Sequence, residues 1–172
     1  MHRGFGSRMT RPTLIWMLLV VVAASIGAVG EAASSEFSAK VIAVLDGDQI
    51  TVVHDRRQQK IRLNGIDSPE VQQPFGKRAK QFTADRTLGK TVTVVSVGKD
   101  RQGRTIADVF LPDGQLLSYL LMKEGLAWWY RQHALDNTVL EQLEREARKA
   151  RKGLWAESNP VAPWQWRRDK RH

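Results

Sequence analysis

The sequence contains no cysteine and no internal repeat, and its acidic residues are scarce. Without cysteine the protein has neither a disulfide bond nor a thiolate metal site or nucleophile, so its fold rests on core packing alone. With no repeat, 172 residues suit one domain with short extensions. Only 18 Asp and Glu residues oppose 27 Lys and Arg, giving a net charge of +9. This excess favours a polyanionic partner such as nucleic acid, although a hydrated surface or anionic lipid headgroups would also accommodate it.

Long uncharged runs are also rare, and the one present covers residues 14–30. Residues 1–13 before it carry three arginines, and small residues follow it, which is the layout of a secretory signal. The run is also close to the minimum length of a membrane-spanning helix. We therefore expect residues 1–33 to be a cleaved signal peptide or an N-terminal membrane anchor. The protein would then be exported, either periplasmic or secreted, and tethered to the inner membrane by residues 14–30 only if that segment is uncleaved.

The most informative stretch is residues 60–70, Lys-Ile-Arg-Leu-Asn-Gly-Ile-Asp-Ser-Pro-Glu. Ile61 and Leu63 alternate with polar residues, which predicts a strand that buries one face and presents Arg62 on the other. A planar guanidinium matches the oxygens of a phosphodiester better than an ammonium does, so Arg62 is a candidate phosphate ligand. The alternative is that Arg62 is a solvated strand residue.

Two carboxylates complete this stretch. Asp67 suits a hard metal ion, and Glu70 is placed to act as a general base. The alternative is that residues 68–70, Ser-Pro-Glu, merely start a helix, with serine as the cap and proline in the first turn.

Two further acidic motifs lie at predicted strand ends. Residues 46–48, Asp-Gly-Asp, separate two strand-like runs, and residues 100–104, Asp-Arg-Gln-Gly-Arg, precede another. Taken alone, the first is typical of a hairpin turn and the second of a charged turn. However, the two motifs lie on either side of the stretch that carries Arg62 and Glu70, and each of the three is at a predicted strand end. This order disfavours the interpretation that all three are merely turns or a helix start.

This order of motifs resembles the staphylococcal nuclease (thermonuclease) family, and specifically an exported bacterial homologue. The resemblance covers about residues 37–157 and includes residues 124–130, Glu-Gly-Leu-Ala-Trp-Trp-Tyr, and residues 152–155, Lys-Gly-Leu-Trp. It implies an α+β fold, a five-stranded OB-type β-barrel with three α-helices, over residues 34–158. The five short strand-like runs suggest the same barrel independently.

The resemblance also assigns roles to individual residues. It implies a calcium (Ca2+) site with these ligands: the side chains of Asp48 and Asp67 and the backbone carbonyl of Ser68, with Asp46 near the metal but not in direct contact. It implies these reacting groups: Arg62 and Arg104 on the scissile phosphate, and Glu70 as the general base for the attacking water. Oxygen ligands suit calcium, and arginines suit the charge that develops on phosphate oxygens, so the chemistry agrees with these roles.

Substrate contacts are expected from Arg101 and Tyr130. Gln49 and Gln102 depart from the family pattern, in which Thr follows the Asp-Gly-Asp motif and a Tyr in the third motif helps to hold the nucleotide. These departures leave open how strongly the metal and the nucleotide bind.

The activity implied by the resemblance is calcium-dependent endonucleolytic hydrolysis of DNA and RNA, largely without sequence preference, leaving 3′-phosphate ends. We expect single-stranded or breathing duplex substrates, no protein partner and a monomer. The alternative is a catalytically silent OB-fold module that binds nucleic acid. Clustered carboxylates favour the nuclease, because they repel phosphate unless a cation intervenes.

Helical spacing predicts three helices. One covers residues 75–88, a second starts near Leu116 and ends at Gly125, and a third runs from a capping box at Thr138 to Gly153. Residues 159–172 form a basic tail that contains proline and tryptophan. Its prolines disfavour a helix, and we expect it to lie against the domain and to end in a mobile basic segment.

Overall fold

The computed structural model describes residues 1–2 and 35–170, apart from the side chain of His133. The chain divides into two units, Met1–Gly30 and Glu31–His172, and every helix and strand described below lies in the second. The signal peptide or anchor expected over residues 1–33 lies outside the described residues, except for its first two. In the described part of the chain, no helix is long and apolar enough to cross a membrane.

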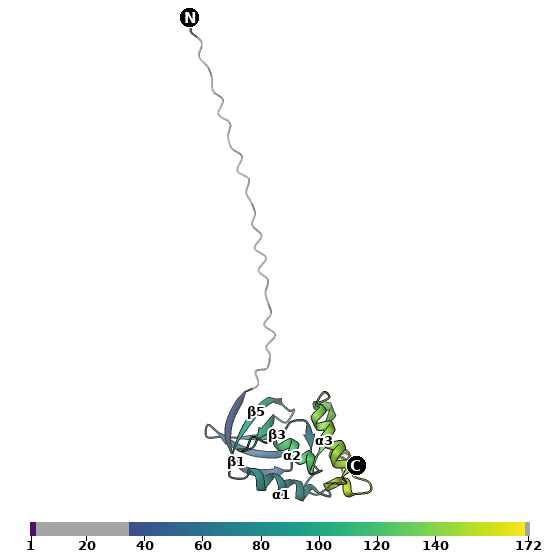
Figure 1. The fold of residues 1–172 in the computed structure, drawn as a ribbon. Coiled ribbons are helices and arrows are strands. Elements are labelled where there is room, and N and C mark those ends of the chain that lie inside the picture. The colour runs from purple at the N-terminus through teal and green to yellow at the C-terminus, as the bar shows by residue number, and fades with distance from the viewer. Residues whose placement is uncertain (3–34, 171–172) are drawn as a thin grey trace. The chain divides into compact units, whose positions relative to one another are not determined.

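Five strands close into a barrel in the order β1-β2-β3-β6-β5 (Figure 1). Their bounds are β1 Glu36–Asp46, β2 Gln49–His54, β3 Arg57–Leu63, β5 Thr91–Lys99 and β6 Thr105–Phe110. Neighbouring strands are antiparallel except for β3 and β6, which are parallel. The five-stranded OB-type barrel expected from the sequence is therefore confirmed.

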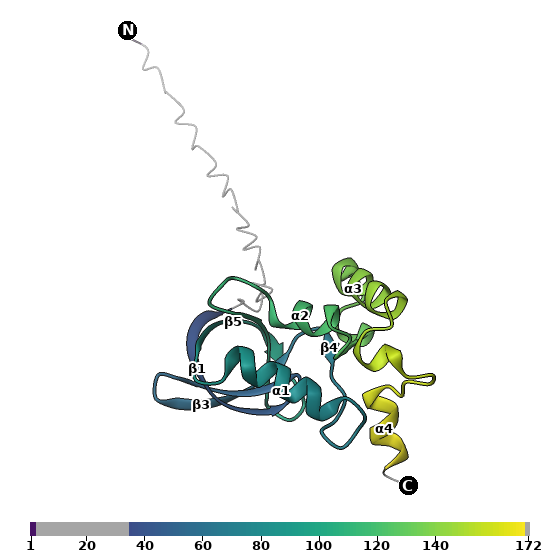
Figure 2. The same ribbon diagram turned by 60° about the horizontal axis from the view of Figure 1, so that its bottom comes forward.

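The barrel interior is filled by aliphatic side chains at alternating strand positions. Val41, Ile50, Val52, Ile61 and Val94 are fully buried, as the period of two in each strand requires. Helix α1 (Gly76–Thr87) lies across one end of this barrel (Figure 2). Its residue Ala79 is fully buried in the same core, so the helix closes that end with a small side chain.

A second layer beside the barrel contains α2 (Leu117–Lys123), α3 (Thr138–Lys149) and a short two-stranded sheet. The sheet pairs β4 (Ile66–Asp67) with β7 (Trp128–Trp129), and Asp67 lies opposite Trp128. Two short 3-10 helices, η1 (Arg131–His133) and η2 (Gly153–Ala156), complete the connections. The extended conformation thus places Asp67 on a paired strand rather than in a free loop.

The third helix differs from its prediction at both ends. Its cap is Asn137, whose side-chain Oδ1 accepts a hydrogen bond from the Leu140 backbone N–H at 3.0 Å, and Thr138 is the first helical residue. The expected capping box at Thr138 is therefore wrong by one residue. The helix ends at Lys149, before Gly153, because the chain turns at Arg151 with a φ of 50° and continues into η2.

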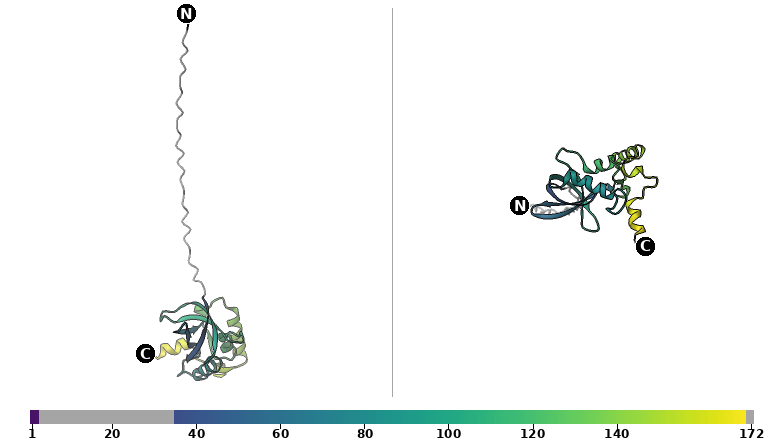
Figure 3. Two further views of the ribbon diagram at one scale, coloured as in Figure 1. Left: turned by 90° about the vertical axis from the view of Figure 1, so that its left-hand side faces the viewer. Right: turned by 90° about the horizontal axis from the view of Figure 1, so that it is seen from below.

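The tail forms a fourth α-helix, α4 (Pro163–Asp169), so the described residues hold four α-helices and not the three expected. Pro163 occupies the first helical turn, where its missing N–H removes no intrahelical bond. Trp164 packs against Trp128 and Tyr130, with ring centroids 5.7 and 5.6 Å apart. The tail lies against the domain, as expected, but the helix replaces the predicted irregular segment. Both views of Figure 3 show α4 at the edge of the domain.

Candidate active site

The turn between β1 and β2 is held rigidly. Gly47 donates its N–H to the side chain of Asp46 at 2.8 Å, and its carbonyl accepts a hydrogen bond from the Thr83 hydroxyl of α1 at 2.6 Å. A Cβ atom at position 47 would lie 2.7 Å from the Ala79 Cβ and 2.8 Å from the Ser68 Cβ. Only glycine fits this space, so the turn is locked between α1 and the segment that follows β4.

Asp48 and Asp67 are joined by a single arginine. Arg62 Nη1 lies 3.0 Å from Asp48 Oδ2, and Arg62 Nη2 lies 3.1 Å from Asp67 Oδ1. Both carboxylates are only 1% exposed. Strand pairing brings Asp48 and Arg62 together, because Gln49, next to Asp48, lies opposite Arg62 in the ladder between β2 and β3. The structure therefore gathers the two predicted metal ligands and one predicted phosphate ligand.

Two carboxyls of this cluster, those of Asp46 and Asp48, bind protons more tightly than usual. Burial raises the pKa of Asp46 to about 7, and the neighbouring charge of Asp48 adds to this effect. Burial likewise raises the pKa of Asp48 to about 6, against the opposing charge of Arg62 and with a further rise from Asp67. Burial alone would lower the pKa of Arg62, but the Asp48 and Asp67 carboxylates raise it above its ordinary value. Arg62 alone therefore does not offset the negative charge of the three aspartates.

This donor set fits a hard cation. It consists of carboxylate oxygens, and their mutual repulsion is the feature that a dication would relieve. In the described part of the chain, no three acidic, histidine or cysteine side chains are already arranged to hold a metal ion. Ser68 is buried beside Asp48, and its backbone N–H lies 3.5 Å from Asp48 Oδ2. Guanidinium groups, not a third carboxylate, contact Asp48 and Asp67.

Glu70 lies in an irregular segment between β4 and α1. Its backbone N–H donates to Gln73 Oε1 at 3.2 Å, and Gln73 in turn donates to the Val161 carbonyl just before α4. Because α1 begins only at Gly76 and Ser68 donates its hydroxyl to the Leu126 carbonyl, just before β7, residues 68–70 are not the start of a helix. The alternative reading of this stretch is therefore wrong, and Glu70 is held by the tail as well as by its own loop.

Arg104, at the turn before β6, is held by two side chains. Its Nε donates to Asp100 Oδ2 at 2.6 Å, and its Nη1 donates to Gln49 Oε1 at 2.6 Å. Asp100 also accepts hydrogen bonds from the backbone N–H groups of Gln102 and Arg104, so the turn is built around this carboxylate. Gln49, which departs from the family pattern, thus positions a predicted phosphate ligand, a role that the sequence did not reveal.

A cavity of about 790 Å³ brings the predicted reacting groups together. Its lining includes three candidate reacting groups, Arg62, Glu70 and Arg104, and both candidate substrate contacts, Arg101 and Tyr130. Arg101 is exposed on its turn, whereas the Tyr130 hydroxyl donates to Gln132 Oε1 at 3.1 Å. All residues predicted to meet the phosphate therefore face one cavity, with Asp48 and Asp67 buried behind Arg62.

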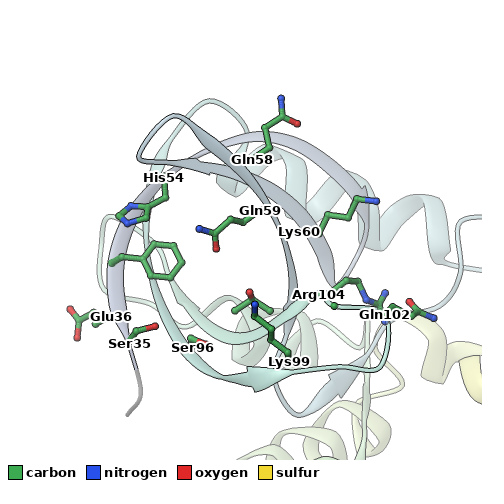
Figure 4. A pocket seen from close by; sticks show the side chains of 13 residues that line it. Ser35, Glu36, His54, Gln58, Gln59, Lys60, Ser96, Lys99, Gln102 and Arg104 are labelled. Atoms are coloured by element: carbon green, nitrogen blue, oxygen red, sulfur yellow. The ribbon is translucent and has the colours of Figure 1, made fainter. Parts of the chain in front are cut away.

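A second cavity, of about 620 Å³, opens at the mouth of the barrel (Figure 4). It shares Lys99, Gln102 and Arg104 with the first cavity, so the two adjoin at the turn between β5 and β6. His54 lines it and stacks on Phe37 with ring centroids 4.5 Å apart. The cations that line the second cavity are Lys60, Lys99 and Arg104, so positive charge continues from the reacting groups to the mouth of the barrel.

The sequence failed to identify one residue of the site. Arg167 of α4, predicted to be part of a mobile basic end, contacts Asp67 Oδ2 at 2.7 Å and Glu70 Oε1 at 2.7 Å. Burial alone would lower the pKa of Arg167, but these two carboxylates raise it above its ordinary value. The available signal was Pro163 in front of a Trp-Gln-Trp-Arg run, which is typical of a helix start.

Comparison with known proteins gives consistent matches. A sequence model described as "Staphylococcal nuclease homologue" matches residues 60–157. A protein of Escherichia coli O157:H7 described as an uncharacterized endonuclease is 40% identical over 136 residues, which are 79% of this chain and 88% of that protein. A micrococcal nuclease of Shigella flexneri is 38% identical over 160 residues, which are 88% of this chain and 92% of that protein. Helix α4 lies beyond the range that the family model matches.

Proposed function

Since the chain belongs to the staphylococcal nuclease family and is a hydrolase of phosphodiester bonds, we propose that it is a calcium-dependent endonuclease. Its substrates are DNA and RNA, cut with little sequence preference to leave 3′-phosphate ends. The observation that carries this proposal is the convergence of Arg62, Glu70 and Arg104 on one cavity, with Asp48 and Asp67 behind it.

The residues of the chain divide the reaction between them. Arg62 and Arg104 bind the oxygens of the scissile phosphate, whose negative charge grows as water attacks phosphorus. Glu70 takes the proton of that water, the new P–O bond forms, and the bond to the 5′ oxygen breaks. The departing 5′ oxygen takes a proton from solvent, which leaves the phosphate on the 3′ side.

Calcium would be held by the side chains of Asp48 and Asp67 and by the backbone carbonyl of Ser68, with Asp46 close by. When bound, it supplies Lewis-acid charge beside the phosphate oxygens. Asp48 and Asp67 are buried and paired with arginines, so a dication binds them only in competition with Arg62 and Arg167.

Broad substrate use follows from the composition of the cavity lining. The lining contains five cations that can bind phosphates, which every strand carries in the same form: Arg62, Lys99, Arg101, Arg104 and Arg167. Tyr130 is positioned to stack on a base, an interaction that tolerates any sequence. Such a cavity takes an unpaired strand more readily than a duplex, so single-stranded or breathing substrates are preferred.

The test is hydrolysis of single-stranded DNA and RNA by the purified chain, with calcium and with excess chelator. We expect calcium-dependent cleavage of both, and products that lose their terminal phosphate to a 3′-phosphatase. Salt-sensitive binding without cleavage would refute the nuclease and favour a module that only binds nucleic acid.

We also propose that the protein is exported. The support is the basic residues 1–13 followed by the uncharged residues 14–30. Fractionation of a producing cell, with N-terminal sequencing of the recovered protein, tests both export and cleavage near residue 33. Recovery of the intact chain from the cytoplasm would contradict this proposal.

A further inference from the structure

Helix α4 packs against the active site through several contacts. Trp164 packs on Trp128 and Tyr130, and Lys170 Nζ donates to Gln72 Oε1 at 2.6 Å. These contacts hold the helix beside the segment that carries Glu70. The position of Arg167 in the site therefore follows from the docking of the whole helix, not from a chance contact of one long side chain.

Arg167 occupies both oxygens of Asp67. Its Nη2 donates to Oδ2 at 2.7 Å, and its Nη1 lies 3.2 Å from Oδ1 and 2.7 Å from Glu70 Oε1. This bidentate pairing is the geometry in which a guanidinium and a carboxylate interact most strongly. Arg167 is 39% exposed, whereas Asp67 is 1% exposed, so the arginine approaches the buried carboxylate from the cavity side.

A cation and Arg167 compete for Asp67. A dication on the carboxylate oxygens would lie within a few ångströms of the guanidinium, and like charges at that distance repel strongly in a buried site. Arg167 lines the same cavity as Arg62 and Arg104. If its guanidinium leaves Asp67, it stays beside the place where these two arginines meet the substrate, and a phosphate oxygen is the partner that accepts its hydrogen bonds there.

On the premise of the calcium-dependent nuclease, we propose that Arg167 is a third phosphate-binding residue, which pairs with Asp67 and Glu70 until a cation and a nucleic-acid phosphate replace them. The C-terminal helix thereby couples metal loading to substrate binding. Without metal, Arg167 neutralises the carboxylates that would otherwise repel one another. With metal, it adds a positive charge to the wall of the phosphate site.

The test compares Arg167→Gln with Arg168→Gln in the full chain. Arg168 is exposed on the same helix and has no ion pair with another described residue, so its substitution removes the same charge without touching the site. Calcium affinity is measured by calorimetry without substrate, and the KM for a single-stranded oligonucleotide is measured at saturating calcium. Arg167→Lys keeps the charge but cannot form the bidentate pair of hydrogen bonds.

We expect Arg167→Gln to bind calcium about tenfold more tightly than Arg168→Gln and to have a KM about tenfold higher, as the loss of one charged hydrogen-bonded contact predicts. Arg167→Lys should fall between them in both measurements. Equal calcium affinity in the two glutamine variants would overturn the competition, and equal KM would overturn the contact with substrate. If the unaltered chain cleaves nothing with calcium, the proposed function itself fails; if it cleaves and Arg167→Gln behaves like Arg168→Gln, only this inference fails.

Discussion

Replacing Arg62 with methionine should destabilise the fold more than any surface substitution, because Arg62 contacts both Asp48 and Asp67. The arginine side chain is 13% exposed and both carboxylates are 1% exposed, so removing it leaves the buried charge of Asp48 without this partner, whereas Asp67 keeps its pair with Arg167. Breaking a buried pair in this way costs about 3–5 kcal/mol.

The lower end of that range is the expected value for Arg62→Met at pH 7. The pKa of Asp48 is already raised to about 6, and loss of Arg62 raises it further, so the carboxyl takes up a proton and avoids part of the penalty. We therefore expect a loss of about 3 kcal/mol in the free energy of unfolding, or about 10 °C in Tm for a domain of this size.

The assay is urea denaturation at pH 7 in chelator, beside Arg57→Met. Arg57 is an exposed residue of the same strand, β3, and tests the loss of a surface arginine. The deficit of Arg62→Met should shrink as the pH falls towards 4.5, because protonation of Asp48, whose pKa is raised to about 6, removes the charge that Arg62 neutralises. A stability equal to that of Arg57→Met at pH 7, or a deficit that grows at low pH, would refute the reasoning.

The site supports four further predictions. Gly47→Ala should lower the stability by about 1–3 kcal/mol, measured by thermal unfolding, because its Cβ would lie 2.7 Å from that of Ala79; an unchanged Tm would contradict the contact. Arg104→Gln should lower kcat about 10²–10³-fold, since its charge is needed on the developing oxyanion; unaltered kcat would contradict that role. Calcium affinity should rise with pH between about 5 and 8, since Asp48, a proposed ligand whose pKa is raised to about 6, must lose its proton to bind, and Asp46, whose pKa is raised to about 7, then adds negative charge close to the metal; calorimetry that shows no dependence on pH would contradict those shifts. In chelator the same raised pKa values favour the folded state at low pH, so its stability should fall as the pH rises from about 4 to 7.

The barrel was predictable because its signals are local. Alternating apolar residues such as Ile61 and Leu63 identify a strand from its own sequence, and the Asp-Gly-Asp turn identifies a hairpin. The gathering of Asp48, Arg62 and Asp67 was also predictable, because each lies near the end of a barrel strand. Asp48 comes directly before β2, Arg62 lies next to the end of β3, and Asp67 follows β3 in the short strand β4. The order of the motifs along the chain was therefore sufficient to identify most residues of the site.

The contacts of Gln49 and Arg167 could not be predicted in the same way. Gln49 reaches Arg104 across 55 residues, and Arg167 reaches Asp67 across 100, so each contact depends on how elements pack and not on a local pattern. The helix that carries Arg167 did have a local signal in Pro163, but the other prolines of the tail outweighed it. The contacts that could not be predicted from the sequence are thus those that position the reacting groups.

The general base gives the most direct test of the account. Glu70→Gln keeps the size of the side chain and can still accept a hydrogen bond, but it cannot take the proton of the attacking water. Glu157→Gln, at an exposed position after η2, removes the same charge outside the cavity that holds Arg62 and Arg104. Cleavage of single-stranded DNA is measured with saturating calcium in a single turnover, and binding is measured in parallel.

We expect Glu70→Gln to cleave about 10²–10⁴-fold more slowly than the unaltered chain while it binds the DNA equally well. Glu157→Gln should cleave at the unaltered rate. Cleavage by Glu70→Gln at the rate of Glu157→Gln would contradict the assignment of the base and, with it, the mechanism built on this site.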